Sequence, residues 1–385
     1  MIPMKDIKGY WNDDGKVGIR NSVAILPLSV FSGVAALNIS NAVEGTVPLL
    51  HPHGRAEIGL NRERFHRNLV NQVLNPNVQS ALLVGYEHKT TEKYLAEIRS
   101  KTKKRIESVV VLDKGTIESV AAGTKLAMDL SSAASEVTRE PMSPADLCIG
   151  IKCGSTDGTS GIASNPAVGA AVDRVVSLGG TAIFSETTEI MGAEDVLSKR
   201  ALNSEVAAKI MNAVKSNEEY ALNLGVDLMG VNPVPDNIEG GISTIEEKSL
   251  GAILKSGTSV IQDVLPFGGI PNGKGLYFMD SPSAAQEVLT ALTSAGSQLI
   301  LFSTGLGNPS GTPISPVIKV TGNRYTVKRI PEHIDVDVSG MIFEDMQRSE
   351  AGDKIYEFML KVINGKRTKA EILKHREFSP VPVGL

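Results

Sequence analysis

Short apolar runs alternate along the chain with longer segments in which apolar positions recur at helical spacing. In the first part, the runs Val23–Leu28, Ser80–Gly85 and Ser108–Asp113 predict strands because they are too short for helices. The segments 61–74 and 91–100 mix charged and apolar residues in the pattern of helices that cover a sheet. This alternation predicts a parallel sheet with both faces covered.

A polar stretch that contains Pro141 and Pro144 interrupts the pattern and predicts a domain boundary. We predict an N-terminal α/β domain over residues 1–140 and a C-terminal α/β catalytic domain over 145–385. In the second domain we expect strands at Leu147–Lys152, Thr181–Phe184, Gln298–Phe302 and Pro316–Val320. We expect a helix at Asn165–Leu178. The predicted fold class is α/β, with two open domains, mainly parallel sheets and an interdomain cleft.

Two helix starts place a capping side chain before a proline, at Asn165–Pro166 and Ser281–Pro282. Gly179 and Gly296 predict the ends of these helices. The first of them follows a glycine-rich loop, so we expect free backbone N–H groups there, which suit a carboxylate or phosphate.

The composition narrows the range of partners and compartments. A net charge of −4 provides no basic field for nucleic acid or an anionic membrane. No apolar run approaches the roughly 18 residues of a membrane span, and the N-terminus has no signal-peptide core. The only two cysteines, Cys148 and Cys153, are poor candidates for a structural disulfide. We therefore expect a soluble cytoplasmic protein without nucleic-acid or membrane partners.

The loop Lys152–Gly161 combines a cation, a thiol, a carboxylate, hydroxyls and glycines directly after a predicted strand. Ligands of open α/β sheets bind outside the carboxyl ends of strands, so the loop is a candidate site rather than a plain turn. It matches neither the Walker A nor the dinucleotide motif.

An acidic cluster with Glu186, Glu189 and Glu194 follows the next strand. Such carboxylates hold hard divalent ions or act as general bases. For Glu194 we favour a simple role in the first turn of a helix, and for Glu186, directly at the strand end, a role in the site.

Histidines gather at two other strand ends, where His51 and His53 flank a proline and His88 follows Glu87. Two histidines with a carboxylate are a common ligand set for a catalytic metal ion, although a single histidine is more often structural.

The segment 239–251, which contains Lys248, is either a helix start with a capping box at Ser243–Glu246 or part of the site. The segment 303–311 is either a long turn or an oxygen-rich rim.

In order along the chain, these segments resemble the altronate and galactarate dehydratases and sulfolactate sulfo-lyase. The matching segments are Gly15–Asn21, Lys152–Ala167, Gly180–Glu186 with Gly192–Glu194, Gly240–Gly251, and Ser303–Gly305 with Ser315–Lys319. The resemblance extends from about Gly9 nearly to the end of the chain, and its motifs are long and specific.

The resemblance implies a metal-dependent dehydratase that eliminates water from a sugar acid such as altronate or galactarate. A base removes the proton next to the carboxylate, a cation stabilises the enediolate, and the product is a 2-keto-3-deoxy acid. We assign Lys152 and Asp157 to proton transfer or carboxylate binding, and together with Glu186 at its strand end they are the expected catalytic residues. The residues assigned to substrate binding are Arg20, Asn21, Thr159, Ser160, Asn165, Lys248 and Thr304, with Arg20 and Asn21 reaching across the interdomain cleft.

The implied cofactor is a divalent metal, Fe²⁺ or Mn²⁺, with His51, Glu87, His88 and Cys153 as candidate ligands. This sequence departs from the family there, because Arg55 and His88 stand where relatives usually carry cysteines. Cys153 is the one motif cysteine kept, which excludes a cluster held by three thiolates.

Many relatives begin with a small β-rich SAF-type domain, which is a separate subunit in split members. The resemblance therefore predicts a small partner subunit or a homo-oligomer. Two alternatives stay open: a sulfolactate sulfo-lyase large subunit, and a non-catalytic sugar-acid-binding homologue with a degenerate metal site. A nicotinamide-dependent dehydrogenase is disfavoured because its glycine fingerprint is absent.

Overall fold

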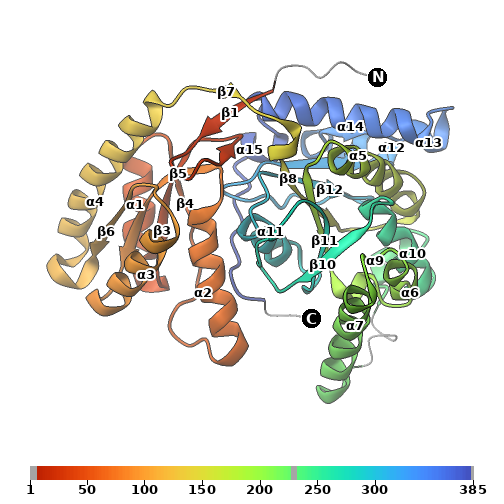
Figure 1. Cartoon of the computed structure of the whole chain (residues 1–385), viewed down its shortest axis with the longest axis horizontal. Coiled ribbons are helices and arrows are strands. Elements are labelled where there is room, and N and C mark those ends of the chain that lie inside the picture. The colour runs from red at the N-terminus through yellow and green to blue at the C-terminus, as the bar shows by residue number, and fades with distance from the viewer. Residues whose placement is uncertain (1–6, 227–231, 383–385) are drawn as a thin grey trace.

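The computed structural model describes residues 7–226 and 232–382 and contains two parallel sheets in neighbouring parts of the molecule (Figure 1). The N-terminal part holds a four-stranded sheet in the order β4-β3-β5-β6, and the C-terminal part a seven-stranded sheet in the order β10-β11-β9-β8-β12-β13-β14. These sheets confirm the predicted α/β fold class. Where the chain is described, no helix is both long and apolar enough to cross a membrane.

The four-stranded sheet lies between two helical layers. Its strands are β3 (Ser22–Pro27), β4 (Thr46–Pro48), β5 (Val78–Gly85) and β6 (Ile106–Val110), and its helices are α1 (Gly33–Ala42), α2 (Gly59–Leu74), α3 (His88–Lys101) and α4 (Val111–Glu136). Because successive strand residues point to opposite faces, Val23 and Ile25 pack with α1 and α4, whereas Ala24 and Leu26 pack with α2 and α3. The predicted strand 108–113 ends early because Val111 already begins α4.

The seven-stranded sheet is covered mainly by α5, α7 and α14 on one face and by α11 on the other. Its strands are β8 (Cys148–Cys153), β9 (Thr181–Ser185), β10 (Ile261–Leu265), β11 (Gly275–Met279), β12 (Leu299–Ser303), β13 (Val317–Thr321) and β14 (Val336–Asp337). The helices are α5 (Asn165–Ser177), α6 (Glu194–Ser198), α7 (Ser204–Asn223), α9 (Pro235–Glu239), α10 (Ile245–Ile253), α11 (Ala285–Ser294), α12 (Arg324–Arg329), α13 (Gly340–Phe343), α14 (Arg348–Ile363) and α15 (Lys369–Ile372). A small antiparallel sheet of β1 (Lys8–Trp11), β2 (Val17–Gly18) and β7 (Glu140–Pro141) lies beside them.

The order of the strands places a topological switch point at β8. The chain passes from β8 to β9 on one side and later returns to β12 on the other side. Parallel sheets of this kind bind ligands outside the carboxyl ends of the strands at such a point. The loop that follows β8 is therefore at the position where the sequence predicts a site.

The predicted helix ends are partly confirmed. Gly179 (φ +84°) and Gly296 (φ +95°) both take the left-handed conformation expected after a helix. Asn165 begins α5 but does not cap it, because Ser160–Ser164 already form a helical turn and the Asn165 side chain donates to the carbonyl of Gly251 (3.0 Å). Likewise, α11 begins at Ala285 rather than next to Ser281.

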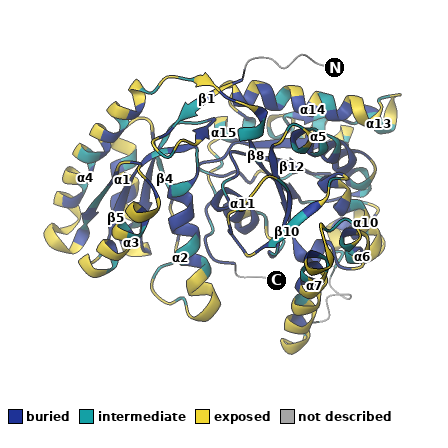
Figure 2. Cartoon of the chain, viewed as in Figure 1, coloured by how far each residue is buried: buried dark blue, intermediate teal, exposed yellow. Residues whose placement is uncertain are grey.

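Buried side-chain amides join the two parts of the molecule. Each donates to a backbone carbonyl of the C-terminal part, and together they form what we call the amide seam: Asn68, Asn71, Gln72, Asn75 and Asn77. The seam residues of α2 lie in its C-terminal half, which is buried, whereas its first turns are exposed (Figure 2). Asn77 also accepts the N–H groups of Ile19 (2.8 Å) and Arg20 (3.2 Å), so both ends of its amide are used.

A cavity of about 430 Å³ lies between the two parts. Its lining includes Cys148 and Thr181, the first residues of β8 and β9. The space between the domains therefore opens at the amino ends of these strands, and the predicted catalytic residues lie at the opposite, carboxyl ends.

Candidate active site

Five polar side chains meet beneath the carboxyl edge of the seven-stranded sheet. Lys152 and Cys153 end β8, Glu186 follows β9, Glu189 ends a short 3-10 turn, and Lys255 lies in the turn after α10. All five are almost completely buried, with at most 4% of their surface exposed. We call these residues the buried charge cluster.

Glycine makes this convergence sterically feasible. A Cβ atom on Gly169 of α5 would lie 2.1 Å from the backbone oxygen of Leu254. Only glycine therefore lets the turn Leu254–Ser256 approach α5 so closely, and that turn carries Lys255 into the cluster.

Two ammonium groups hold the carboxylate of Glu186. Lys255 Nζ lies 2.5 Å from Glu186 Oε2, and Lys152 Nζ forms an ion pair with Oε1. Lys255 Nζ also contacts Cys153 Sγ (2.9 Å) and Glu189 Oε2 (3.2 Å). The Cys153 thiol donates to Glu189 Oε2 (2.8 Å), so each carboxylate has charged and hydrogen-bonding partners.

The backbone of Glu186 has φ +85°, which is rare for a residue with a side chain. Such a conformation costs about 1–3 kcal/mol and persists where the surroundings determine it. Here the N–H of Glu186 donates to Ser281 Oγ (3.1 Å), and the N–H of Cys153 donates to Glu186 Oε2 (3.1 Å). Backbone strain at a buried carboxylate is typical of functional sites.

Burial and charge displace the pKa values of the cluster in different directions. Burial raises the pKa of Glu186 and that of the Cys153 thiol. Burial also acts to raise the pKa of Glu189, but the positive charges of Lys255 and Lys152 outweigh it and lower this pKa to about 2. Burial disfavours the charge on Lys255, yet its anionic neighbours raise its pKa well above the usual value. Glu186 is therefore the carboxyl group best suited to proton transfer near neutral pH.

Asp157 orders the loop above the cluster. Its Oδ1 accepts from Thr159 Oγ1 (2.6 Å) and the Ser160 N–H (3.1 Å), and its Oδ2 accepts from Asn323 (2.7 Å). A Cβ atom on Gly305 would lie 2.1 Å from Asp157 Oδ1, so glycine is needed there. In this structure Asp157 anchors the start of the helical turn before α5.

Other residues predicted to bind substrate lie around the same edge of the sheet. Thr304 follows β12, is fully buried, and accepts from the Gly307 N–H (3.0 Å). Lys248 of α10 donates to Asn232 Oδ1 (2.8 Å). Helix α10 begins with Thr244 as its capping residue, one position after the predicted Ser243. The structure thus brings the predicted residues of the C-terminal domain to one edge.

Arg20 and Asn21 lie elsewhere, at the amino end of β3. Arg20 forms an ion pair with Glu371 (2.7 Å) and donates to the carbonyl of Val362 (3.0 Å), while Asn21 donates to the carbonyl of Ala134 (2.6 Å). These contacts tie the N-terminal sheet to its surroundings and do not extend to the buried charge cluster.

The histidines predicted as metal ligands are not brought to Cys153. His51 Nε2 contacts the carbonyl of Pro27 (2.8 Å), and its Nδ1 accepts from the His53 N–H (3.2 Å). His88 is exposed and pairs with Asp113 (2.5 Å), and Glu87 accepts from Thr90 (2.8 Å) at the start of α3. Both ring nitrogens of His51 are therefore already used by the backbone.

Within the described residues, the side chains that can jointly hold a metal ion are Cys153, Glu186 and Glu189, whose ligand atoms lie within 4.8 Å of one another. Thiolate and carboxylate ligands suit a divalent ion. However, Lys255 Nζ contacts the same three atoms and takes the position of a cation. The arrangement does not fit a metal ion unless Lys255 moves away.

Sequence reasoning missed Lys255. A usable signal was present, because Lys255 follows Lys248 by seven residues, or two helical turns, which places both on one face of a continuing helix. Glu189 was recognised within the acidic cluster but was not given a role of its own.

The burial of His51 predicts a pH-dependent stability. Burial lowers its pKa to about 4, so the folded protein holds this ring neutral while the unfolded chain protonates it near pH 6.5. The stabilisation is complete above about pH 6.5, is lost progressively as the pH falls from there through 4, and amounts to about 3 kcal/mol. His51→Gln should reduce the fall in unfolding free energy between pH 7 and pH 4 by about this amount, measured by urea denaturation. An unchanged pH dependence would contradict the prediction.

Comparison with known proteins matches both parts of the chain. Residues 9–135 match the second domain of D-galactarate dehydratase/altronate hydrolase, and residues 144–385 match the C-terminal domain of D-galactarate/altronate dehydratase. The (2R)-sulfolactate sulfo-lyase subunit beta of Chromohalobacter salexigens is 40% identical over 96% of this chain and 95% of its own length.

Two further relatives are dehydratases. The altronate dehydratase of Bacillus subtilis is 31% identical over 95% of this chain and 76% of its own length. The galactarate dehydratase (L-threo-forming) of Escherichia coli is 35% identical over 60% of this chain and 44% of its own length. The predicted relationship is confirmed, and the chain belongs to the D-galactarate/altronate dehydratase family of lyases, which spans carbon–oxygen and carbon–sulfur bond cleavage.

Proposed function

We propose that the chain catalyses β-elimination from a small 2-hydroxy acid at the buried charge cluster. The observation that carries this proposal is the carboxylate of Glu186, which has a raised pKa and lies between two ammonium groups at the topological switch point. A base of this kind beside fixed positive charge is what removal of a proton next to a carboxylate requires.

In the proposed reaction, Glu186 takes the proton from the carbon next to the substrate carboxylate. Lys152 and Lys255 stabilise the negative charge of the enediolate. The substituent on the next carbon leaves with its bonding electrons, and the enol becomes a 2-keto acid. A departing hydroxide takes a proton from Lys152, whereas sulfite leaves as a stable anion and needs none. No step is assigned to the expected Fe²⁺ or Mn²⁺.

Substrate access requires loop movement, because the cluster is buried. The loops after β8 and β12 are joined at Ser155, whose carbonyl accepts from the N–H groups of Gly305 (3.1 Å) and Leu306 (2.9 Å). Thr159 in the loop after β8 and Asn308 in the loop after β12 are both half-buried. We propose that these two loops separate to admit the substrate and then exclude water.

Two leaving groups are in competition, and each has its own support. Sulfite is favoured by the 40% identity to a sulfolactate sulfo-lyase subunit over nearly the whole of both chains. Water is favoured by the relatives that are named altronate and galactarate dehydratases.

Because the sulfo-lyase relative is named as a subunit, we also propose that this chain acts with a second, smaller subunit.

The test is an anaerobic assay of sulfolactate, altronate and galactarate, with Fe²⁺ or Mn²⁺, with EDTA, and with or without a co-expressed small subunit. Both 2-keto acid and sulfite are measured. Equal amounts of the two from sulfolactate identify a sulfo-lyase, and 2-keto acid without sulfite identifies a dehydratase. Binding of an acid without turnover in any condition, by folded protein, would contradict the proposal and favour a non-catalytic homologue.

A further inference from the structure

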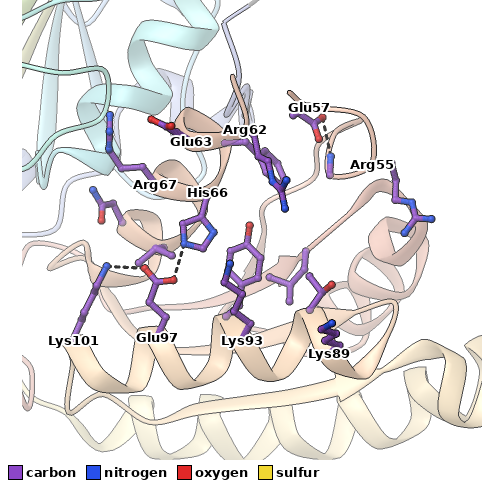
Figure 3. A pocket seen from close by; sticks show the side chains of 17 residues that line it. Arg55, Glu57, Arg62, Glu63, His66, Arg67, Lys89, Lys93, Glu97 and Lys101 are labelled. Carbon is purple, nitrogen blue, oxygen red and sulfur yellow. Dashed lines mark hydrogen bonds and ion pairs between the residues drawn. The ribbon is translucent and has the colours of Figure 1, made fainter. Parts of the chain in front are cut away.

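A large groove lies in the N-terminal domain, away from the buried charge cluster. It has a volume of about 920 Å³ and runs between α2 and α3 (Figure 3). Its lining includes Leu28, which follows β3, and Lys89 and Thr90, which follow β5. The order β4-β3-β5-β6 changes direction between β3 and β5, so one end of the groove lies at the switch point of the four-stranded sheet. We call it the basic groove.

The basic groove is positively charged on a protein of net charge −4. Three glutamates line it against six cationic side chains, which are Arg55, Arg62, Arg67, Lys89, Lys93 and Lys101. Figure 3 shows Lys89, Lys93 and Lys101 along α3, and their spacing of four or eight residues places them on one helical face. A concentration of one charge in a concave site attracts ligands of the opposite charge.

The glutamates do not neutralise all of these cations. Glu97 pairs with Lys101 (2.8 Å) and His66 (2.6 Å), and Glu57 accepts from the backbone N–H of Gly54 (3.0 Å). By contrast, three cations make no ion pair or hydrogen bond within residues 7–226 and 232–382, and these are Arg62, Lys89 and Lys93. They come from two helices on opposite sides of the groove.

The floor of the groove is apolar and aromatic. Phe65 and Tyr94 are both buried in the hydrophobic core of this domain and line the groove with Val70. Arg67 is held by the carbonyl of Phe267 (3.0 Å). A concave site with an apolar floor and a few converging polar groups is the usual form of a small-molecule site.

We propose that the basic groove binds a small organic acid with two anionic groups, one contacting Arg62 and the other contacting Lys89 and Lys93. Two cationic walls favour a dianion over a monoanion, since a single acid group engages only one wall. The carbon skeleton between the acid groups contacts Phe65 and Tyr94. This site is distinct from the buried charge cluster, and the proposal does not rest on the proposed function, because ligand binding is measured without turnover.

The test uses malate as the dianionic probe and lactate, which is the same 2-hydroxy acid without the second carboxylate, as the monoanion. Isothermal titration should show malate binding that is at least about tenfold tighter than lactate binding. The double variant Arg62→Ala, Lys93→Ala should weaken malate binding at least about tenfold, while Lys125→Ala, which removes an exposed lysine of α4, should leave it unchanged. Malate should also protect Lys89 and Lys93, but not Lys125, from acetylation in a mass-spectrometric footprint.

Malate binding that survives the double variant, or a footprint that protects neither Lys89 nor Lys93, would overturn the proposal. Equal affinity for malate and lactate would overturn the assignment of a dianion. The removed side chains make no ion pair within the described chain, so circular dichroism and thermal unfolding should show the double variant folded as the wild type is.

Discussion

Glu186→Gln is expected to lower the rate of 2-keto acid formation by about a thousandfold. The substitution keeps the size of the side chain, but an amide does not take up the proton that elimination removes, and its NH₂ group does not accept the hydrogen bonds that one carboxylate oxygen accepts. Glu186 is fully buried and forms ion pairs with both Lys152 and Lys255, so its carboxyl group is the one placed beside the two ammonium groups. The measurement is the initial rate at saturating substrate, by semicarbazone absorbance.

Glu194→Gln is the matched control for this substitution. Glu194 belongs to the same acidic stretch of sequence, but it lies in the first turn of α6 and accepts from the backbone N–H of Gly192 (2.6 Å). Its removal should leave the rate nearly unchanged. A Glu186→Gln enzyme with more than a tenth of wild-type activity would show that another group is the base.

Lys255→Met is expected to destabilise the fold by about 3–5 kcal/mol. Methionine fills nearly the same space, but it removes the ammonium group that contacts both Glu186 and Glu189, while Lys152 stays paired with Glu186. Urea denaturation measures the loss. Lys248→Met, two helical turns earlier and only half-buried, should change stability by less than about 1 kcal/mol.

The pH dependence of the unfolding free energy distinguishes this electrostatic effect from poor packing of the methionine side chain. Without Lys255, the pKa values of the two carboxyl groups rise above those of the unfolded chain. Groups whose pKa is raised by folding stabilise the fold at low pH and lose that contribution as the pH rises. The deficit of Lys255→Met should therefore be smaller at pH 5 than at pH 8, and adding Glu186→Gln should recover part of it. A deficit that is the same at both pH values would indicate a packing defect instead.

Local sequence patterns predicted most of the fold because they reflect local physics. Apolar runs such as Leu147–Lys152 became strands within one residue of the prediction, and glycines such as Gly179 end helices where only glycine readily adopts a positive φ. Strand positions and helix ends depend on a few neighbouring residues, so they can be predicted from a single sequence.

The candidate site was predictable only in part, because its contacts connect residues far apart along the chain. Lys152 and Glu186 lie at the carboxyl ends of adjacent parallel strands, and the sequence therefore placed them together. The seven-residue spacing from Lys248 was a local signal for Lys255, but it did not show that the turn of Lys255 enters the same site, and nothing local indicated that Glu371 pairs with Arg20. His51 resembled a metal ligand, but the carbonyl of Pro27 and the N–H of His53 engage its two nitrogens, and a sequence does not show such backbone contacts.

The amide seam has a consequence for motion. Many two-domain enzymes capture a ligand by bending at a hinge, which requires an interface that separates at little cost. Here, any opening would break the hydrogen bonds of five amide side chains at once, at a net cost of about 0.5–1.5 kcal/mol for each bond that is exchanged for water. Both parts should therefore unfold in one cooperative transition, and relative motion in the native state should be confined to surface loops.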